Sequence, residues 1–201
     1  LALRQYDDLD FLVHRRDIER AIAALAKRHY IPVLSLSAEE RRELIRLGWG
    51  CSLQAPDSAY RVELDSGVLP RYQEVDLRDD DIWQDLHPMP FHNATVPSLP
   101  PEHLLLLLAV HGCKHTWERL IWVADVSALI HRHPAMDWVA LFDAATRAGA
   151  RRMLLLALRL AVDIHDAGIA PDVWFAVQKE PGLNELAAVA LSHLQSGEPA
   201  T

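Results

Sequence analysis

Hydrophobic and polar residues follow two different periods along the chain, and the change of period divides it into two parts. Up to about residue 80, short apolar runs and strict alternation predict β-strands at residues 10–13, 60–64 and 72–77. A turn containing Gly67 and Pro70 separates the last two strands, so we expect them to pair as a hairpin. Beyond about residue 100, apolar residues recur at helical spacing instead.

Two amphipathic helices are expected between these strands. The first follows Asp17, a suitable N-cap, and places its apolar residues on one stripe. The second covers residues 38–47, with Ser37 as its N-cap and Gly48 at its end. Each helix therefore has one apolar face that can pack against a sheet.

A segment rich in proline separates the two parts. Five prolines fall within residues 88–101, which predicts an irregular linker. Pro101 and Glu102 occupy the favoured first positions of a helix. Further helices are expected at about residues 118–131, 137–148, 150–166 and 182–195. The expected divisions are an α/β core at 1–87, the linker at 88–101 and a helical domain at 102–201.

Composition narrows the class of protein and its partners. The 201 residues are 50% hydrophobic and 24% charged, as in globular proteins, and the formal net charge is −8. This acidity repels phosphate backbones, so we expect no large nucleic-acid surface, although a nucleotide neutralised by Mg²⁺ could still bind. The apolar run at 104–110 is too short to cross a membrane. Cys51 and Cys113 lack metal-site spacing and indicate a reducing, cytoplasmic setting.

Two aspartates carry the strongest chemical signal in the sequence. Asp8 and Asp10 lie two residues apart as the chain enters the strand Phe11–Val13, so both carboxylates should project from the same face. Two like charges held so close repel each other unless a cation lies between them. Mg²⁺ prefers such oxygen ligands and completes its shell with water and phosphate. The alternative interpretation is an acidic strand entry without a ligand.

A third carboxylate on a neighbouring strand would complete a site for two metal ions. Such a group helps hold the second metal and can accept the proton of an attacking hydroxyl. Glu63 is the leading candidate, because the apolar residues on either side of it face the other way. Asp65 shares its face and is a weaker candidate, as are Glu74 and Asp76 on the following strand. The alternative for all of them is a solvent-facing strand edge.

A second polar cluster lies at residues 111–119. His111 and His115 share a helix face if the helix is continuous, which allows a zinc site, although no third ligand is spaced nearby. Lys114, His115 and Arg119 could instead contact a triphosphate, with Trp117 against a base or sugar. The alternative is that both histidines are structural.

These motifs, in this order, resemble the uncharacterised bacterial nucleotidyltransferase family of the polymerase-β-like superfamily. The resemblance runs from the first residues to about residue 165. It is carried by Arg4–Val13, Val62–Leu64, Pro100–Leu104, His111–Trp117 and Leu120–Val126. The Asp-Leu-Asp strand is shared across the superfamily, and the His-rich helix followed by Trp and a later Asp is more particular to the family.

The resemblance implies a fold and an activity. The fold is α+β, a small mixed sheet flanked by helices and followed by an all-helical region. The activity is Mg²⁺-dependent transfer of a nucleotidyl group from a nucleoside triphosphate to an unknown hydroxyl acceptor. Asp8 and Asp10 would be metal ligands, and Glu63 would be the third acidic residue. The alternative is an inactive nucleotide- or partner-binding module of the same fold, similar to an antitoxin.

Two departures from the family pattern affect this expectation. The superfamily places a Gly-Gly or Gly-Ser turn upstream of the first Asp, where it grips the triphosphate. This sequence begins seven residues before Asp8, without that turn and without an initiator Met, so we expect an N-terminally truncated core. The family also usually has His where this chain has Asp65. A metal-dependent hydrolase built on His111 and His115 is a further alternative.

Overall fold

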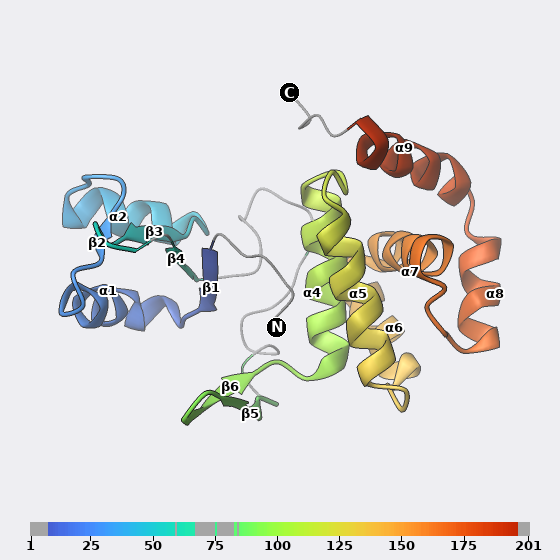
Figure 1. Cartoon of the computed structure of the whole chain (residues 1–201), viewed down its shortest axis with the longest axis horizontal. Coiled ribbons are helices and arrows are strands. Elements are labelled where there is room, and N and C mark those ends of the chain that lie inside the picture. Colours follow the sequence, from blue (N-terminus) through green and yellow to red (C-terminus); the bar gives the residue numbers. More distant parts are fainter. Residues whose placement is uncertain (1–7, 59, 67–74, 76–82, 84, 197–201) are drawn as a thin grey trace. The chain divides into compact units, whose positions relative to one another are not determined.

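A computed structural model describes residues 8–58, 60–66 and 85–196, together with the single positions 75 and 83. The chain divides into two compact units, Leu1–Leu77 and Arg78–Thr201. Figure 1 shows strands and two helices in the first unit and a helical bundle in the second. The fold is therefore α+β, as the sequence predicts. Domain boundaries at 1–87, 88–101 and 102–201 stay a prediction.

The first unit is built on a four-stranded mixed sheet. Its strands are β1 (Asp8–Leu12), β4 (Arg61–Asp65), β3 (Cys51–Gln54) and β2 (Ile31–Pro32), and they lie side by side in that order. The β1–β4 pair is parallel, whereas the β3–β4 and β2–β3 pairs are antiparallel. Among the described strands β1 is thus at one edge, and β4 lies inside the sheet with a neighbour on each side.

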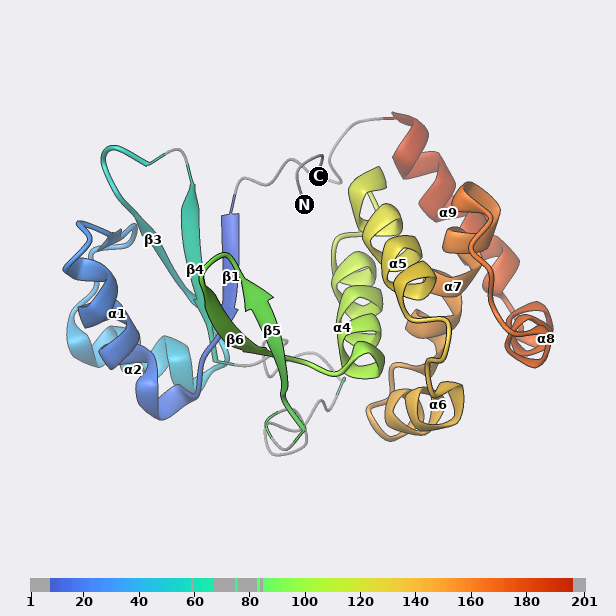
Figure 2. The same cartoon turned by 60° about the horizontal axis from the view of Figure 1, so that its bottom comes forward.

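Two helices cover one face of this sheet (Figure 2). A short 3₁₀ turn, η1 (Arg15–Asp17), leads into α1 (Ile18–Ala26), and α2 (Ala38–Arg46) follows β2. The predicted N-cap of α2 is confirmed, because Ser37 and Glu40 form a reciprocal capping box. The shared core consists of Ile18, Ile22, Ile45, Cys51, Leu53, Val62 and Leu64. Both helices therefore pack on the same set of alternate strand residues.

The hairpin expected between residues 60–64 and 72–77 is wrong. β4 is already bonded to β1 along one edge and to β3 along the other, so neither edge can accept another strand. The expected partner at 72–77 lies outside the described residues. Two strands of the four-stranded sheet, β2 and β3, were not predicted. β2 is only two residues long and β3 only four, so neither is long enough to show a clear alternation.

The proline-rich segment is not irregular as predicted. It forms the hairpin of β5 (His87–Phe91) and β6 (Ala94–Ser98), an antiparallel two-stranded sheet. Proline lacks the N–H that a central strand needs, but it is tolerated where one edge of a strand has no neighbour. With only two strands in the sheet, each has such an edge, so prolines that suggested a linker are compatible with strands.

Beyond β6, the described part of the second unit is mainly helical. Its helices are α4 (Pro101–Lys114), α5 (Leu120–Arg132), α6 (Trp138–Arg147), α7 (Arg151–His165), α8 (Pro171–Lys179) and α9 (Leu183–Ser196). α7 is the central helix and contacts each of the other five. α8 was not expected from the sequence. Among the described residues, no helix has the length and apolar character needed to span a membrane.

Candidate functional site

Three acidic side chains gather on the face of the sheet opposite α1 and α2. Asp8 and Asp10 alternate with Leu9 along β1, so both project from one face. The parallel pairing places Asp10 directly beside Glu63, and paired residues on neighbouring strands share a face. The predicted approach of a third acid from the next strand is therefore present in the structure.

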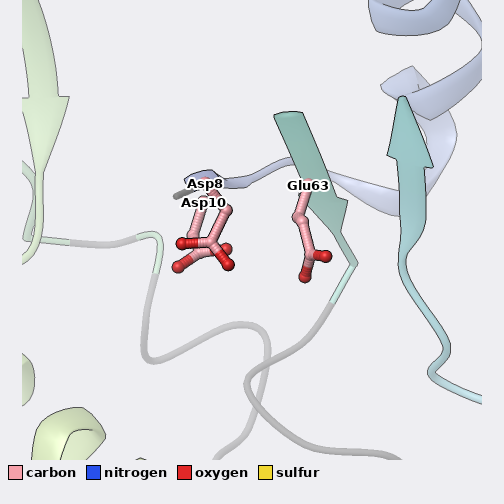
Figure 3. A group of neighbouring side chains, drawn as sticks. All are labelled: Asp8, Asp10 and Glu63. Atoms are coloured by element: carbon pink, nitrogen blue, oxygen red, sulfur yellow. The ribbon is translucent and has the colours of Figure 1, made fainter. Parts of the chain in front are cut away.

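The three carboxylates are close enough to share a cation. One carboxylate oxygen from each of Asp8, Asp10 and Glu63 lies within 4.8 Å of the others. In Figure 3 the two aspartates point the same way from β1, and Glu63 extends beside them from β4. Asp8 and Asp10 are exposed and Glu63 is half-buried, so water and phosphate oxygens could complete a coordination shell.

The local sequence explains why these acids meet. On β4, Val62 and Leu64 are 3% and 2% exposed and belong to the core, which forces Glu63 to the opposite face. The β1–β4 register then fixes which acid lies beside it. Three carboxylates this close repel one another, and hard oxygen donors of this kind suit Mg²⁺. The donor set therefore fits the metal that the resemblance implies.

The weaker acidic candidates do not join this group. Asp65 lies two residues beyond Glu63, but its carboxylate occupies the space that a side chain on Gly50 would need. Within the described part of the chain, the close group contains Glu63 and not Asp65. Glu74 and Asp76, the other candidates, fall outside the described residues. Glu63 is thus the third acid that the structure brings to the pair.

The histidine cluster belongs to the second unit. α4 ends at Lys114 with His115 as its C-cap, so the helix reaches both histidines and their rings lie on one side of it. The ring centroids of His111 and His115 are 4.8 Å apart, and each ring lies within 5.4 Å of the Trp122 ring. Burial, followed by the charge of Lys114, lowers the pKa of His115. Both effects favour the neutral form of the His115 ring.

The zinc and base-stacking interpretations of this cluster lack support in the structure. Among the described residues, the single group of three or more metal-ligand side chains is the carboxylate group, so the two histidines belong to no such set. Trp117 is 1% exposed and packs against Gly112, where any side chain would collide with its ring. Trp117 is a core residue and is not available to a base. The roles of Lys114, His115 and Arg119 toward a nucleotide stay predictions.

The open face of the sheet carries other polar residues that were not among the predicted site residues. Arg61 lies two residues before Glu63, and β3 contributes Ser52 and Gln54 opposite Glu63 and Arg61. The signal was present in the alternation of residues 60–64, which puts Arg61 on the same face as Glu63. β3 was not predicted as a strand, so its two polar residues could not be assigned to that face.

Comparison with known proteins identifies the family of this chain. No curated protein and no solved structure matches the chain. A family described as an uncharacterised nucleotidyltransferase matches residues 1–166, a range that includes the three close carboxylates and the histidine cluster. Since this match spans most of the chain and contains the acidic site, the chain belongs to the uncharacterised nucleotidyltransferase family.

Proposed function

We propose that this protein transfers a nucleotidyl group from a nucleoside triphosphate to a hydroxyl acceptor, with Mg²⁺ held by Asp8, Asp10 and Glu63. The observation that carries the proposal is the approach of these carboxylates to within 4.8 Å on an exposed sheet face. Family membership supports nucleotidyl transfer in general. The metal, the triphosphate and the roles of the three residues are our assignment.

The donor set determines how the reaction would run. When bound, two Mg²⁺ ions neutralise the triphosphate and polarise its α-phosphate. Asp8 and Asp10 orient the phosphates on the β1 side, and Glu63 accepts the proton of the acceptor hydroxyl. The hydroxyl oxygen then bonds to the α-phosphorus. At the same time the bond between the α-phosphorus and the oxygen that bridges it to the β-phosphate breaks, and pyrophosphate leaves with that electron pair. The chain forms no covalent intermediate.

Lys114, His115 and Arg119 are our candidates for contact with a nucleotide. Lys114 and Arg119 are exposed cations that could pair with phosphate oxygens, and neutral His115 could donate or accept a hydrogen bond. We place the reaction in the cytoplasm, where the thiols of Cys51 and Cys113 would stay reduced; both are free. The acceptor is a small hydroxyl compound rather than a nucleic acid, given the net charge of −8.

Neutralising one acid tests the proposal directly. Asp10→Asn keeps the shape of the side chain but removes a charged ligand, so binding of Mg²⁺–ATP should weaken at least tenfold by calorimetry. Pyrophosphate release should fall by a factor of about 10² or more, because stabilisation of the transferred phosphate is lost. Asp57→Asn, a matched change at an exposed aspartate outside the group, should alter neither value.

Three outcomes separate the proposal from its alternatives. Unchanged Mg²⁺–nucleotide binding in Asp10→Asn would contradict the metal assignment. Binding that depends on Asp10 without any pyrophosphate release or labelled product would favour an inactive nucleotide-binding module of the same fold. Stoichiometric zinc in the purified protein, lost in His111→Ala, would instead support a hydrolase centred on the histidine cluster.

A further inference from the structure

The open face of the sheet carries a groove next to the acidic group. Residues paired across the four strands form one row, in which Asp8, Arg61, Gln54 and Ile31 are neighbours in turn. The next row on this face contains Asp10, Glu63 and Ser52. The groove, of about 320 Å³, is lined by Ile31, Pro32, Val33, Gln54, Pro56 and Arg61. It therefore lies on the same face as the carboxylates, toward β2.

The chemical character of the groove differs from that of the acidic group. Its walls are apolar. Ile31 and Val33 are large hydrophobic residues that are 60% and 51% exposed, so neither belongs to the core. Its charged residue is Arg61, which is exposed and lies beside Asp8 in the β1–β4 register. Gln54 is held in place because its amide nitrogen donates to the carbonyl oxygens of Ser58 and Tyr60, at 2.6 and 3.3 Å.

The distance between the groove and the acids suits one bound molecule. Arg61 and Glu63 are two residues apart on β4, which separates their Cα atoms by roughly 7 Å. Neighbouring strands lie about 4.8 Å apart, so Gln54 is one strand beyond Arg61 and Ile31 is two. A compound of ten or so heavy atoms can reach from this groove to the carboxylate of Glu63.

The direction of the reaction assigns this groove to the acceptor. In an in-line displacement, the attacking oxygen and the leaving pyrophosphate lie on opposite sides of the α-phosphorus. Glu63 takes the proton from the attacking hydroxyl, so the acceptor must lie on the Glu63 side of the phosphates. Asp8 and Asp10 lie on β1, whereas β3 and β2 lie on the other side of β4, toward the groove.

We propose that the groove at Ile31, Val33, Gln54 and Arg61 binds the acceptor, a small hydroxyl compound with an apolar body and an anionic group. The apolar walls take the body, and the Arg61 guanidinium takes a carboxylate or phosphate, both of which match its planar array of donors. The assignment of this ligand as acceptor rests on the proposed function. The groove's preference for an anionic apolar molecule rests on its lining alone.

Binding of three matched probes tests this proposal. 4-Hydroxyphenylacetate and 4-hydroxyphenyl phosphate share a hydroxyl and a ring but differ in their anion, and 4-hydroxyphenylacetamide has no charge. Each is titrated into the whole chain, with and without Mg²⁺ and a non-hydrolysable ATP analogue, and followed by backbone amide NMR. We expect at least one anionic probe to shift the amides of Ile31, Val33, Gln54 and Arg61. We expect the uncharged probe to bind at least tenfold more weakly.

Substitutions in the groove make the test specific. Arg61→Gln should reduce the affinity of the anionic probes to that of the uncharged one, whereas Arg28→Gln, at an exposed arginine of the same unit, should have no effect. Val33→Asp adds a carboxylate to an exposed position of the wall and should weaken anionic probes at least tenfold. Which of the two anionic probes binds more tightly decides between a carboxylate and a phosphate.

Two results would overturn the proposal. One is equal binding of charged and uncharged probes in both the parent chain and Arg61→Gln. The other is an Arg61→Gln variant that loses affinity for Mg²⁺–ATP and keeps its affinity for the probes, which would place Arg61 at the triphosphate. Failure of the nucleotidyltransferase assignment is seen separately, in the Mg²⁺–ATP titration of Asp10→Asn, because that titration uses no acceptor probe.

Discussion

The two faces of the small sheet are formed by the same strands but differ in polarity. The face under α1 and α2 is apolar, and Leu53, Val62 and Leu64 on it are at most 3% exposed. The other face presents Asp8 and Asp10 to solvent, with Glu63 half-buried beside them. β3 and β4 thus send alternate residues into a core that stabilises the fold and onto a surface that can bind a ligand.

The difference between the two faces predicts which residues can be substituted without loss of the fold. Apolar side chains in the core gain free energy by leaving water, and each contributes to stability. The close carboxylates gain nothing from one another, because like charges repel. Acidic residues that gather on the exposed face of the sheet, away from the core, are candidates for binding a ligand, and the comparison can be tested at neighbouring positions.

The largest expected effect comes from a matched pair of substitutions on β3. Leu53→Ala removes a fully buried side chain and should lower the free energy of unfolding by about 2–5 kcal/mol in urea denaturation. Ser52→Ala, one residue away on the open face, should leave it unchanged or raise it, because the buried Ser52 hydroxyl has no hydrogen-bond partner among the described residues. Similar losses in both variants would contradict the division between the faces.

A smaller effect is expected from removing charge on the open face without metal. In the presence of EDTA, Asp10→Asn should have a melting temperature close to that of the parent chain, because the substitution keeps the shape of an exposed side chain and removes one charge from a group of like charges. Addition of Mg²⁺ should then raise the melting temperature of the parent chain more than that of the variant. A variant that is destabilised in EDTA would show that Asp10 stabilises the fold itself.

The acidic site could be predicted from the sequence because its determinants are local. Alternation puts Asp8 and Asp10 on one face, and apolar neighbours fix the direction of Glu63. The sheet order was not predictable in the same way. The partner of residues 60–64 was expected next along the chain, whereas β4 pairs with β1 and β3, which come earlier in the sequence. Alternation shows which face a residue occupies and not which strand lies beside it.

The remaining errors concern features that depend on tertiary contacts. The hairpin at 87–98 was missed because proline removes a backbone donor, and the sequence does not show that the strands containing it have open edges. The expected role of Trp117 at a nucleotide was wrong because burial depends on the fit of its ring against Gly112. The groove near Arg61 required the register of three strands, which follows from tertiary pairing.

The most direct test of the central claim is to locate the metal. Crystals of the whole chain grown with Mn²⁺, as a substitute for Mg²⁺, and a non-hydrolysable ATP analogue would show the ion through its anomalous scattering. The carboxylates of Asp8, Asp10 and Glu63 should coordinate the ion, with triphosphate oxygens completing its shell. An ion bound elsewhere, or a triphosphate that occupies another surface while these carboxylates bind only water, would contradict the account.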